Sequence, residues 1–224
     1  EKIKDLLPDF APSLGGLWIP EGFTISCSSY LQGLWKACEA LGATLNIKET
    51  PNLTALKEYC HVVVACGDSS FNFLNLPITF DLVKGHLLTF SLEDNSFSLP
   101  FNIVGKKYFV MDTTGKKLHL GASFERNFDS KEPSLEIAKT LNLEEGIKML
   151  PCLKDFPILG CKAGIRLMIS GRLPIAGKVA PKTWVITGFG AKGLLYHSWC
   201  AKQLAHSLIN DSPDFLESPL RRFF

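Results

Sequence analysis

Residues 182–210 read KTWVITGFGAKGLLYHSWCAKQLAHSLIN. The run Thr183–Ile186 is β-branched and aromatic, which predicts a short buried strand. Three glycines then interrupt the chain, and after them apolar residues recur at helical spacing as far as Leu208. The stretch therefore predicts a strand, a glycine-rich turn and a helix, in that order.

The glycine-rich turn aims the free N–H groups of a helix start at one point, where the positive end of the helix dipole also lies. Such a point suits an anionic or electron-rich ligand. Gly188, Gly190 and Gly193 would let a flat ligand approach the backbone, because no Cβ intrudes there. An ordinary strand-turn-helix connection with glycine caps has the same pattern, and a bare Gly-x-Gly-x-x-Gly leaves that alternative open.

A second stretch lies upstream, where residues 163–177 read AGIRLMISGRLPIAG. Together the two stretches resemble the C-terminal flavin-binding signature of the glycine and D-amino-acid oxidase family. That signature has Gly-x-Arg, a short spacer, a segment with glycine, proline and glycine, a strand, and a glycine-rich turn that opens the last helix. Order and spacing both fit, and the resemblance implies FAD as the cofactor.

Composition and charge restrict the class of protein. The 224 residues are 46% hydrophobic and 21% charged, as in ordinary globular proteins. The formal charge of +2 comes from 24 basic and 22 acidic residues, and the basic ones are scattered, so charge does not support nucleic-acid binding. No apolar run approaches the roughly 20 residues of a membrane span. Seven widely spaced cysteines without metal-ligand spacing predict reduced thiols in a cytoplasmic protein and no metal site.

The first part of the chain predicts half of an open α/β sheet. Leu17–Ile19 indicates a short strand closed by proline, Cys27–Leu41 a helix that ends at a glycine, and Ala43–Ile47 another strand. His61–Gly67 is continuously apolar in its middle, which predicts a parallel strand covered on both faces. Ligands of such sheets bind beyond the carboxyl ends of the strands. The segments Gly15–Gly22 and Val63–Gly67 also resemble the family, whose members pass close to the flavin at a turn like the second.

The middle of the chain switches to strand patterns. Short strands are predicted at Ile78–Phe80, Leu87–Leu92, Tyr108–Met111 and Leu118–Leu120, with Asn95-Ser96 as one turn-rich separator. The last two predict a β-hairpin around residues 112–115. Residues 133–149 then predict a helix whose apolar set is Leu135, Ile137, Ala138, Leu141, Ile147 and Leu150.

The order of these elements predicts a mixed α/β fold of two interleaved units. Residues 20–75 and 155–215 form an incomplete Rossmann-like FAD-binding unit, and residues 1–19 and 76–154 form a mostly antiparallel, β-rich substrate-binding unit. Family members begin with a Gly-x-Gly-x-x-Gly segment that holds the dinucleotide, and none precedes Glu1. We therefore expect a fragment, the last two thirds of a usual member, which by itself binds FAD weakly or not at all.

The resemblance also implies roles for individual residues. Arg166, at the Gly-x-Arg position, would clamp a substrate carboxylate, since the arginine fork grips a carboxylate through two hydrogen bonds. A structural arginine paired with a carboxylate is the alternative. Leu167 and Ser170 depart from the family pattern, which leaves the substrate open. Tyr108 is a further candidate for the substrate pocket. The cofactor contacts implied are Gly67, Gly164, Arg166, Gly188, Gly190, Ala191, Lys192, Gly193 and Leu194, and Lys192 would add positive charge near the flavin.

Three functions are compatible with these features. The first is an FAD-dependent oxidoreductase that oxidises the C–N bond of a small amine or amino acid by hydride transfer to flavin N5. The second resembles the oxidase domain of tRNA wobble-uridine-modifying enzymes; the near-neutral charge argues against it, and tRNA stays open as a partner. The third is a non-catalytic binding or scaffold module of the same fold.

Overall fold

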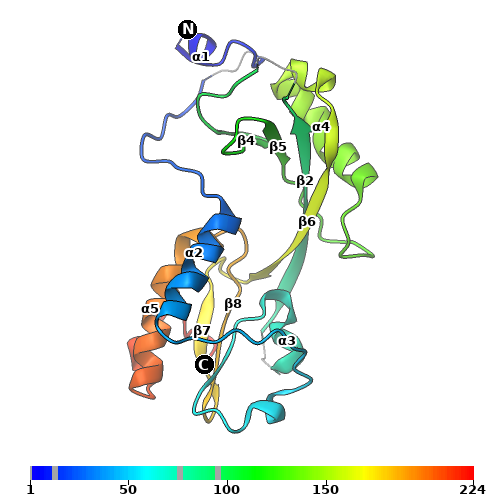
Figure 1. Cartoon of the computed structure of the whole chain (residues 1–224). Helices are drawn as coiled ribbons and strands as arrows, with labels where there is room; N and C mark the ends of the chain where they lie inside the picture. Colours follow the sequence, from blue (N-terminus) through cyan, green and yellow to red (C-terminus); the bar gives the residue numbers. More distant parts are fainter. Residues whose placement is uncertain (1, 12–14, 75–77, 94–96) are drawn as a thin grey trace. The chain divides into compact units, whose positions relative to one another are not determined.

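The computed structural model describes residues 2–11, 15–74, 78–93 and 97–224 (Figure 1). The chain divides into two compact units. Unit 1 comprises residues 1–47, 85–124 and 130–164, and unit 2 comprises residues 48–84, 125–129 and 165–224. Helices combine with one mostly antiparallel and one mixed sheet, so the predicted mixed α/β class is confirmed.

A five-stranded sheet has the order β3-β4-β5-β2-β6, and most of its pairs lie in unit 1. The strands are β2 (Phe80–Ser91), β3 (Ile103–Val104), β4 (Tyr108–Met111), β5 (Lys117–Gly121) and β6 (Ile158–Ile169). Strands β4 and β5 form the predicted hairpin, in which the Asp112 carboxylate accepts hydrogen bonds from the Lys116 and Lys117 amides. The strand predicted at Ile78–Phe80 is wrong, because β2 begins only at Phe80 and then continues through the predicted Leu87 strand. The separator Asn95-Ser96 lies outside the described residues.

Helix α4 (Leu135–Met149) begins after its N-cap Ser134, whose hydroxyl accepts a hydrogen bond from the Ile137 amide. The helix is confirmed, and its predicted apolar face is confirmed in part. Ala138 and Leu150 are buried and Ile147 packs against the core, but Leu135, Ile137 and Leu141 are each at least 40% exposed. The other buried residues of the helix are Asn142 and Gly146.

Hydrogen bonding and close approach explain this choice of face. A Cβ on Gly146 would lie 2.6 Å from Leu120 and 2.9 Å from Leu153, so the glycine admits these core side chains against the helix. Asn142 is satisfied within the core, since its amide donates to the Ala138 and His86 carbonyls and its oxygen accepts from Lys107. The core beneath α4 consists of Leu88, Phe90, Leu92, Phe109, Leu118, Leu120, Ala138, Leu150, Leu153 and Phe156.

His119 on β5 gives unit 1 a predicted pH dependence. Its Nδ1 lies 3.0 Å from the Thr89 hydroxyl, and partial burial lowers its pKa, against an opposing effect of Asp112. Because the pKa is lower in the folded state, the unfolded chain takes up the proton first as the pH falls below about 6.5. Stability that is present above this pH should be lost as the pH falls toward the folded pKa.

Urea unfolding from pH 8 to pH 5 tests this prediction, with His119→Asn as the comparison. All other side chains are the same in both proteins, so the difference between the two unfolding free energies isolates His119. We expect the variant to lose less stability than the wild type on acidification. Equal losses would show that His119 does not contribute.

The first 47 residues carry two short helices and no strand in the part that is described. Helix α1 spans Lys2–Leu6 and α2 spans Cys27–Ala40, which confirms the predicted helix with its stop at Gly42. The strands predicted at Leu17–Ile19 and Ala43–Ile47 are wrong. Leu17 is 87% and Ile47 is 93% exposed, and neither segment pairs with a described strand, so no ladder supports an extended strand there.

Unit 2 contains a three-stranded sheet with the order β1-β8-β7. Strand β1 (Val62–Val64) is parallel to β8 (Thr183–Thr187), and β8 is antiparallel to β7 (Ile175–Ala180). The parallel strand predicted after His61 is thus confirmed, but Val63 is 40% exposed, so the expected cover on both faces is wrong there. Helix α5 (Gly193–Ile209) packs with Trp184, and the short helix α3 (Ser70–Phe73) follows β1.

The C-terminal segment is hydrogen-bonded to the turn between β6 and β7. The Arg222 guanidinium donates to the carbonyl oxygens of Ser170, Leu173 and Pro174 at 2.7–3.1 Å, and also to that of Pro219. Three charge-assisted hydrogen bonds from one side chain to this turn make it a fixed element of unit 2.

The two compact units differ in range from the predicted ones. Helix α2, predicted within the FAD-binding range 20–75, groups with unit 1, and the predicted boundary at residues 75/76 lies outside the described residues. The assignment of flavin to one unit and substrate to the other stays a prediction. Within the described ranges, no helix is long and apolar enough to cross a membrane.

Candidate functional site

Two turns follow the carboxyl ends of neighbouring parallel strands in unit 2. Gly67 begins a short 3-10 turn after β1, and Gly188 follows directly on β8. The hydroxyl of Thr187, a residue only 2% exposed, donates a hydrogen bond to the Gly67 carbonyl oxygen at 3.2 Å. The structure thus joins two turns that lie 120 residues apart in the sequence, at the edge where α/β sheets bind ligands.

The turn after β8 is shaped by its glycines. Gly188 has a φ of +77°, and a Cβ at this position would lie 2.3 Å from the Ile169 side chain. The Gly190 amide donates to the Leu167 carbonyl at 3.0 Å, and Phe189 forms a β-bridge with Met168. The turn is therefore folded closely onto the last residues of β6.

Helix α5 starts where this turn ends. Its N-cap residue is Lys192, no side chain caps the helix start, and its first turn holds no acidic residue. The first N–H groups of a helix have no partner within the helix, so those of Gly193 and Leu194 are oriented to bind an electron-rich group. Ala191, Lys192 and Leu194 are exposed, and the Lys192 ammonium lies 5.8 Å from the Tyr196 ring centroid. The helix start thus presents positive charge to a ligand.

Gly67 presents an open backbone face. Its φ is +59°, and a Cβ built on it would meet nothing within 4 Å. At Gly190 the nearest atom to such a Cβ is the Met168 Cγ, at 3.4 Å. Bare backbone beside an uncapped helix start fits a flat, electron-rich group such as the flavin ring, so the residues present are compatible with the implied cofactor.

Arg166 lies on β6, close in sequence to the part of the strand that contacts the turn. Side chains alternate along a strand, and the buried Leu167 and Ile169 point to one face. Arg166 therefore shares the other face with Met168, the residue that contacts Gly190. Arg166 is partly buried, and its guanidinium makes neither a hydrogen bond nor an ion pair with any described residue. An arginine of this kind retains its donors for a ligand, as the proposed clamp requires.

Two predicted residues lie in unit 1. The Tyr108 ring covers Gly121, where a Cβ would be 2.6 Å from the tyrosine hydroxyl oxygen. Gly164, on β6, is exposed, with nothing within 4 Å of a Cβ. Nothing in their surroundings assigns them to the substrate or the cofactor, so both roles stay predictions.

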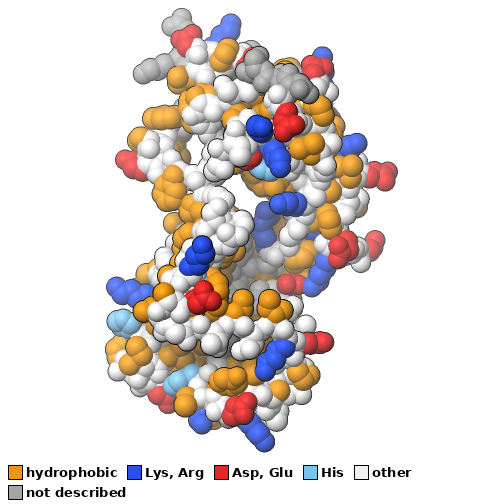
Figure 2. Space-filling model, in the orientation of Figure 1, with side chains coloured by type: hydrophobic (Ala, Val, Ile, Leu, Met, Phe, Trp, Pro, Cys, Tyr) orange, Lys and Arg blue, Asp and Glu red, His pale blue; other side chains and the backbone are white. Residues whose placement is uncertain are grey.

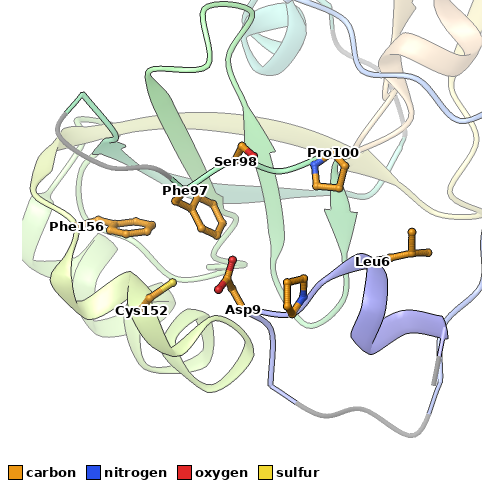
Figure 3. Close-up of a pocket in the computed structure, with 8 residues that line it drawn as sticks. Leu6, Asp9, Phe97, Ser98, Pro100, Cys152 and Phe156 are labelled. Atoms are coloured by element: carbon orange, nitrogen blue, oxygen red, sulfur yellow. The ribbon is translucent and has the colours of Figure 1, made fainter.

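Unit 1 also contains an open cavity of about 450 Å³, which includes none of the predicted site residues. Figure 3 shows Asp9, Cys152 and Phe97 around it. Burial, followed by the charge of Asp9, raises the pKa of the Cys152 thiol, which makes it a poor nucleophile. The charged group of the cavity, Asp9, is itself exposed, and we assign the cavity no role.

Sequence reasoning missed Thr187 as part of the site. The sequence offered one signal for it, because Thr187 is a polar residue at the end of an apolar strand and directly before Gly188. The role of Thr187 depends on its contact with Gly67, and only the fold brings the two residues together.

The basic residues are scattered, as the sequence predicted. On the face that Figure 2 shows, Lys and Arg side chains are dispersed among acidic and apolar ones.

Known proteins resemble this chain in sequence and in structure. The bifunctional protein ThiO/ThiG of Nostoc sp. is 26% identical in an alignment 222 residues long, which covers 92% of this chain and 34% of that protein. The tRNA 5-methylaminomethyl-2-thiouridine biosynthesis bifunctional protein MnmC of Delftia acidovorans is 28% identical in an alignment 132 residues long, which covers 53% of this chain and 20% of that protein. The chain thus spans about a third or less of the curated relatives it matches.

A solved structure and a family model extend the comparison. The structure of the glycine oxidase of Bacillus cereus aligns with 68% of this chain and with 43% of the oxidase chain, with a TM-score of 0.57 at 21% sequence identity. The two proteins therefore share a fold. The family model of the FAD-dependent oxidoreductases, DAO, matches residues 1–207. It includes both turns and Arg166, and the chain therefore belongs to the FAD-dependent oxidoreductases of the DAO family.

Proposed function

We propose that this chain forms the flavin-facing part of an oxidoreductase that oxidises the C–N bond of a small amine or amino acid. The observation that carries the proposal is the pair of turns joined by Thr187, where the open Gly67 backbone and the uncapped start of α5 lie at the carboxyl ends of β1 and β8. Family membership supports FAD as the group that this backbone would hold.

The backbone of residues 188–194 and of Gly67 would hold the flavin ring. When bound, FAD supplies the acceptor for a hydride from the substrate carbon. The exposed Lys192 adds positive charge to the dipole at the start of α5, which favours negative charge on a group bound there.

Arg166 would bind and orient the substrate. Its guanidinium, which has no partner among the described residues, can hold a carboxylate through two hydrogen bonds. Such a grip fixes the direction of the neighbouring C–H bond. The imine that leaves the site is then hydrolysed by water. Leu167 and Ser170 depart from the family pattern. They do not indicate which side chain the amino-acid substrate carries.

A second substrate class is favoured by one observation. The MnmC protein, whose name refers to tRNA 5-methylaminomethyl-2-thiouridine, matches about half of the chain. An amine attached to RNA would undergo the same C–N chemistry. A net charge of +2 provides little attraction for the phosphate backbone, so the small amine or amino acid remains our first proposal.

An absorption spectrum tests the proposed function directly. It would be recorded with and without added FAD, on this chain and on the longest natural protein that carries it. A bound-flavin band in the latter supports the oxidoreductase, and screening with glycine, small secondary amines and modified tRNA then separates the substrate classes. No flavin band in either protein would favour the non-catalytic scaffold.

Cysteine usage bears on the location of the protein. The seven cysteines are widely spaced in the sequence, and all of them are free thiols. From the sequence we propose a reducing compartment, the cytoplasm.

A further inference from the structure

We propose that Thr187 is a positioning residue that holds the Gly67 turn in the geometry that receives the flavin ring. The inference rests on the function proposed above, but the hydrogen bond on which it depends belongs to unit 2 alone. Thr187 itself is 2% exposed, so it acts through Gly67 rather than through contact with a ligand.

The strand pairing ends before the turn begins. Strand β1 pairs with β8 only from Val62 to Val64, opposite Thr183 to Val185. The next three residues, 65–67, are all exposed. The Thr187 hydroxyl therefore adds one more hydrogen bond between the two chain segments after the backbone pairing of β1 and β8 has ended.

The ends of the same loop are held by apolar packing. Val64 before the turn and Leu74 after it are buried with Val185 of β8 in one cluster. Between these anchors the chain makes a 3-10 turn in which the Gly67 carbonyl also accepts a hydrogen bond from the Ser70 amide. Gly67 thus receives one donor from its own turn and one from β8, and the second fixes the turn relative to the flavin-facing glycines.

The consequence for a ligand follows from peptide geometry. The peptide group is planar, so a fixed Gly67 carbonyl also fixes the orientation of the amide that follows it. Gly67 has no atom within 4 Å of a Cβ position, which leaves this oriented backbone open on one side. Without the hydroxyl, the exposed turn would rotate more freely, and a flat ring would have to order it on binding.

Three substitutions in the natural protein test the inference. Thr187→Val removes the hydroxyl and keeps the shape, whereas Thr187→Ser keeps the hydroxyl. Thr183→Val is the matched control, because Thr183 lies at the other end of β8 and its hydroxyl is 3.5 Å from the Pro181 carbonyl. The first measurement is hydrogen exchange of the Ser69 and Ser70 amides without FAD. We expect exchange about 3- to 10-fold faster in Thr187→Val, the effect of losing one neutral hydrogen bond, and rates near wild type in the other two variants.

FAD affinity is the second measurement, followed by the change in flavin absorption. Thr187→Val should weaken binding about 3- to 10-fold, and Thr187→Ser should restore it. Unchanged exchange at Ser69 and Ser70 would overturn the inference whether or not flavin binds. Faster exchange with unchanged FAD affinity would also overturn it, because the turn would then not receive the flavin. If even the wild type binds no FAD, the proposed function fails, and with it the flavin role of Thr187.

Discussion

Replacement of Arg166 by methionine is expected to abolish most of the activity toward amino-acid substrates while the protein stays folded. The guanidinium makes no hydrogen bond or ion pair with a described residue, so its loss leaves no buried protein group without a partner. In the clamp, however, the substrate carboxylate would lose a paired cation, which costs about 2–5 kcal/mol in a desolvated site. This corresponds to a fall in kcat/KM of roughly 30- to 4,000-fold, chiefly through a higher KM.

Steady-state kinetics on the flavin-loaded natural protein would measure this effect. Arg172→Met is the matched control, because Arg172 is an exposed arginine in the turn after β6 and should leave the kinetics unchanged. A substrate amine without a carboxylate provides a second control, since its KM should not respond to Arg166→Met. An unchanged KM for carboxylate substrates would remove Arg166 from the site.

Substitution of Gly188 by alanine should have the largest effect on stability. A residue with a side chain is strained at a φ of +77°, at a cost of about 1–2 kcal/mol. The new Cβ would also lie 2.3 Å from Ile169, a side chain that is 3% exposed and packed in the core, which adds about 1–3 kcal/mol of overpacking. We therefore expect unit 2 to lose about 2–5 kcal/mol and the glycine turn to lose its shape for the flavin.

Urea unfolding followed by tryptophan fluorescence would measure the loss, since Trp184 is buried on β8, the strand that leads into this turn. Gly67→Ala separates the cost of backbone strain from the cost of the clash with Ile169. Gly67 has a φ of +59° but no atom within 4 Å of a Cβ, so alanine there is strained without a clash and should cost about 1–2 kcal/mol. If Gly188→Ala were no more destabilising than Gly67→Ala, the contact with Ile169 would not constrain the turn.

Local signals explain which elements could be predicted. The hairpin of β4 and β5 has short alternating strands around a turn-rich tetrapeptide, and α5 follows glycines with an apolar period of 3.6. Such signals act within about ten residues, so they do not depend on the rest of the fold. The strands expected at Leu17 and Ala43 were wrong because a strand forms only where another strand pairs with it, and local sequence does not show whether a partner is near.

The face of α4 shows what periodicity alone could not decide. Of the predicted stripe, Ala138 is buried but Leu135 and Leu141 are exposed. Asn142 and Gly146 are buried beside Ala138. Burial of Asn142 depends on Lys107 and the His86 carbonyl, and burial of Gly146 depends on the shapes of Leu120 and Leu153. These partners come from other parts of the sequence.

The sequence by itself determined the order of strand, glycine turn and helix from Thr183 to Ile209, and with Arg166 it determined the family, because these features are encoded by neighbouring residues. Only the tertiary structure decided that Thr187 meets Gly67 and that Arg166 keeps its donors free among the described residues. The physical reason is distance along the chain. A hydrogen bond across 120 residues, or the absence of a carboxylate beside an arginine, follows from how the strands pair and cannot be predicted from local composition.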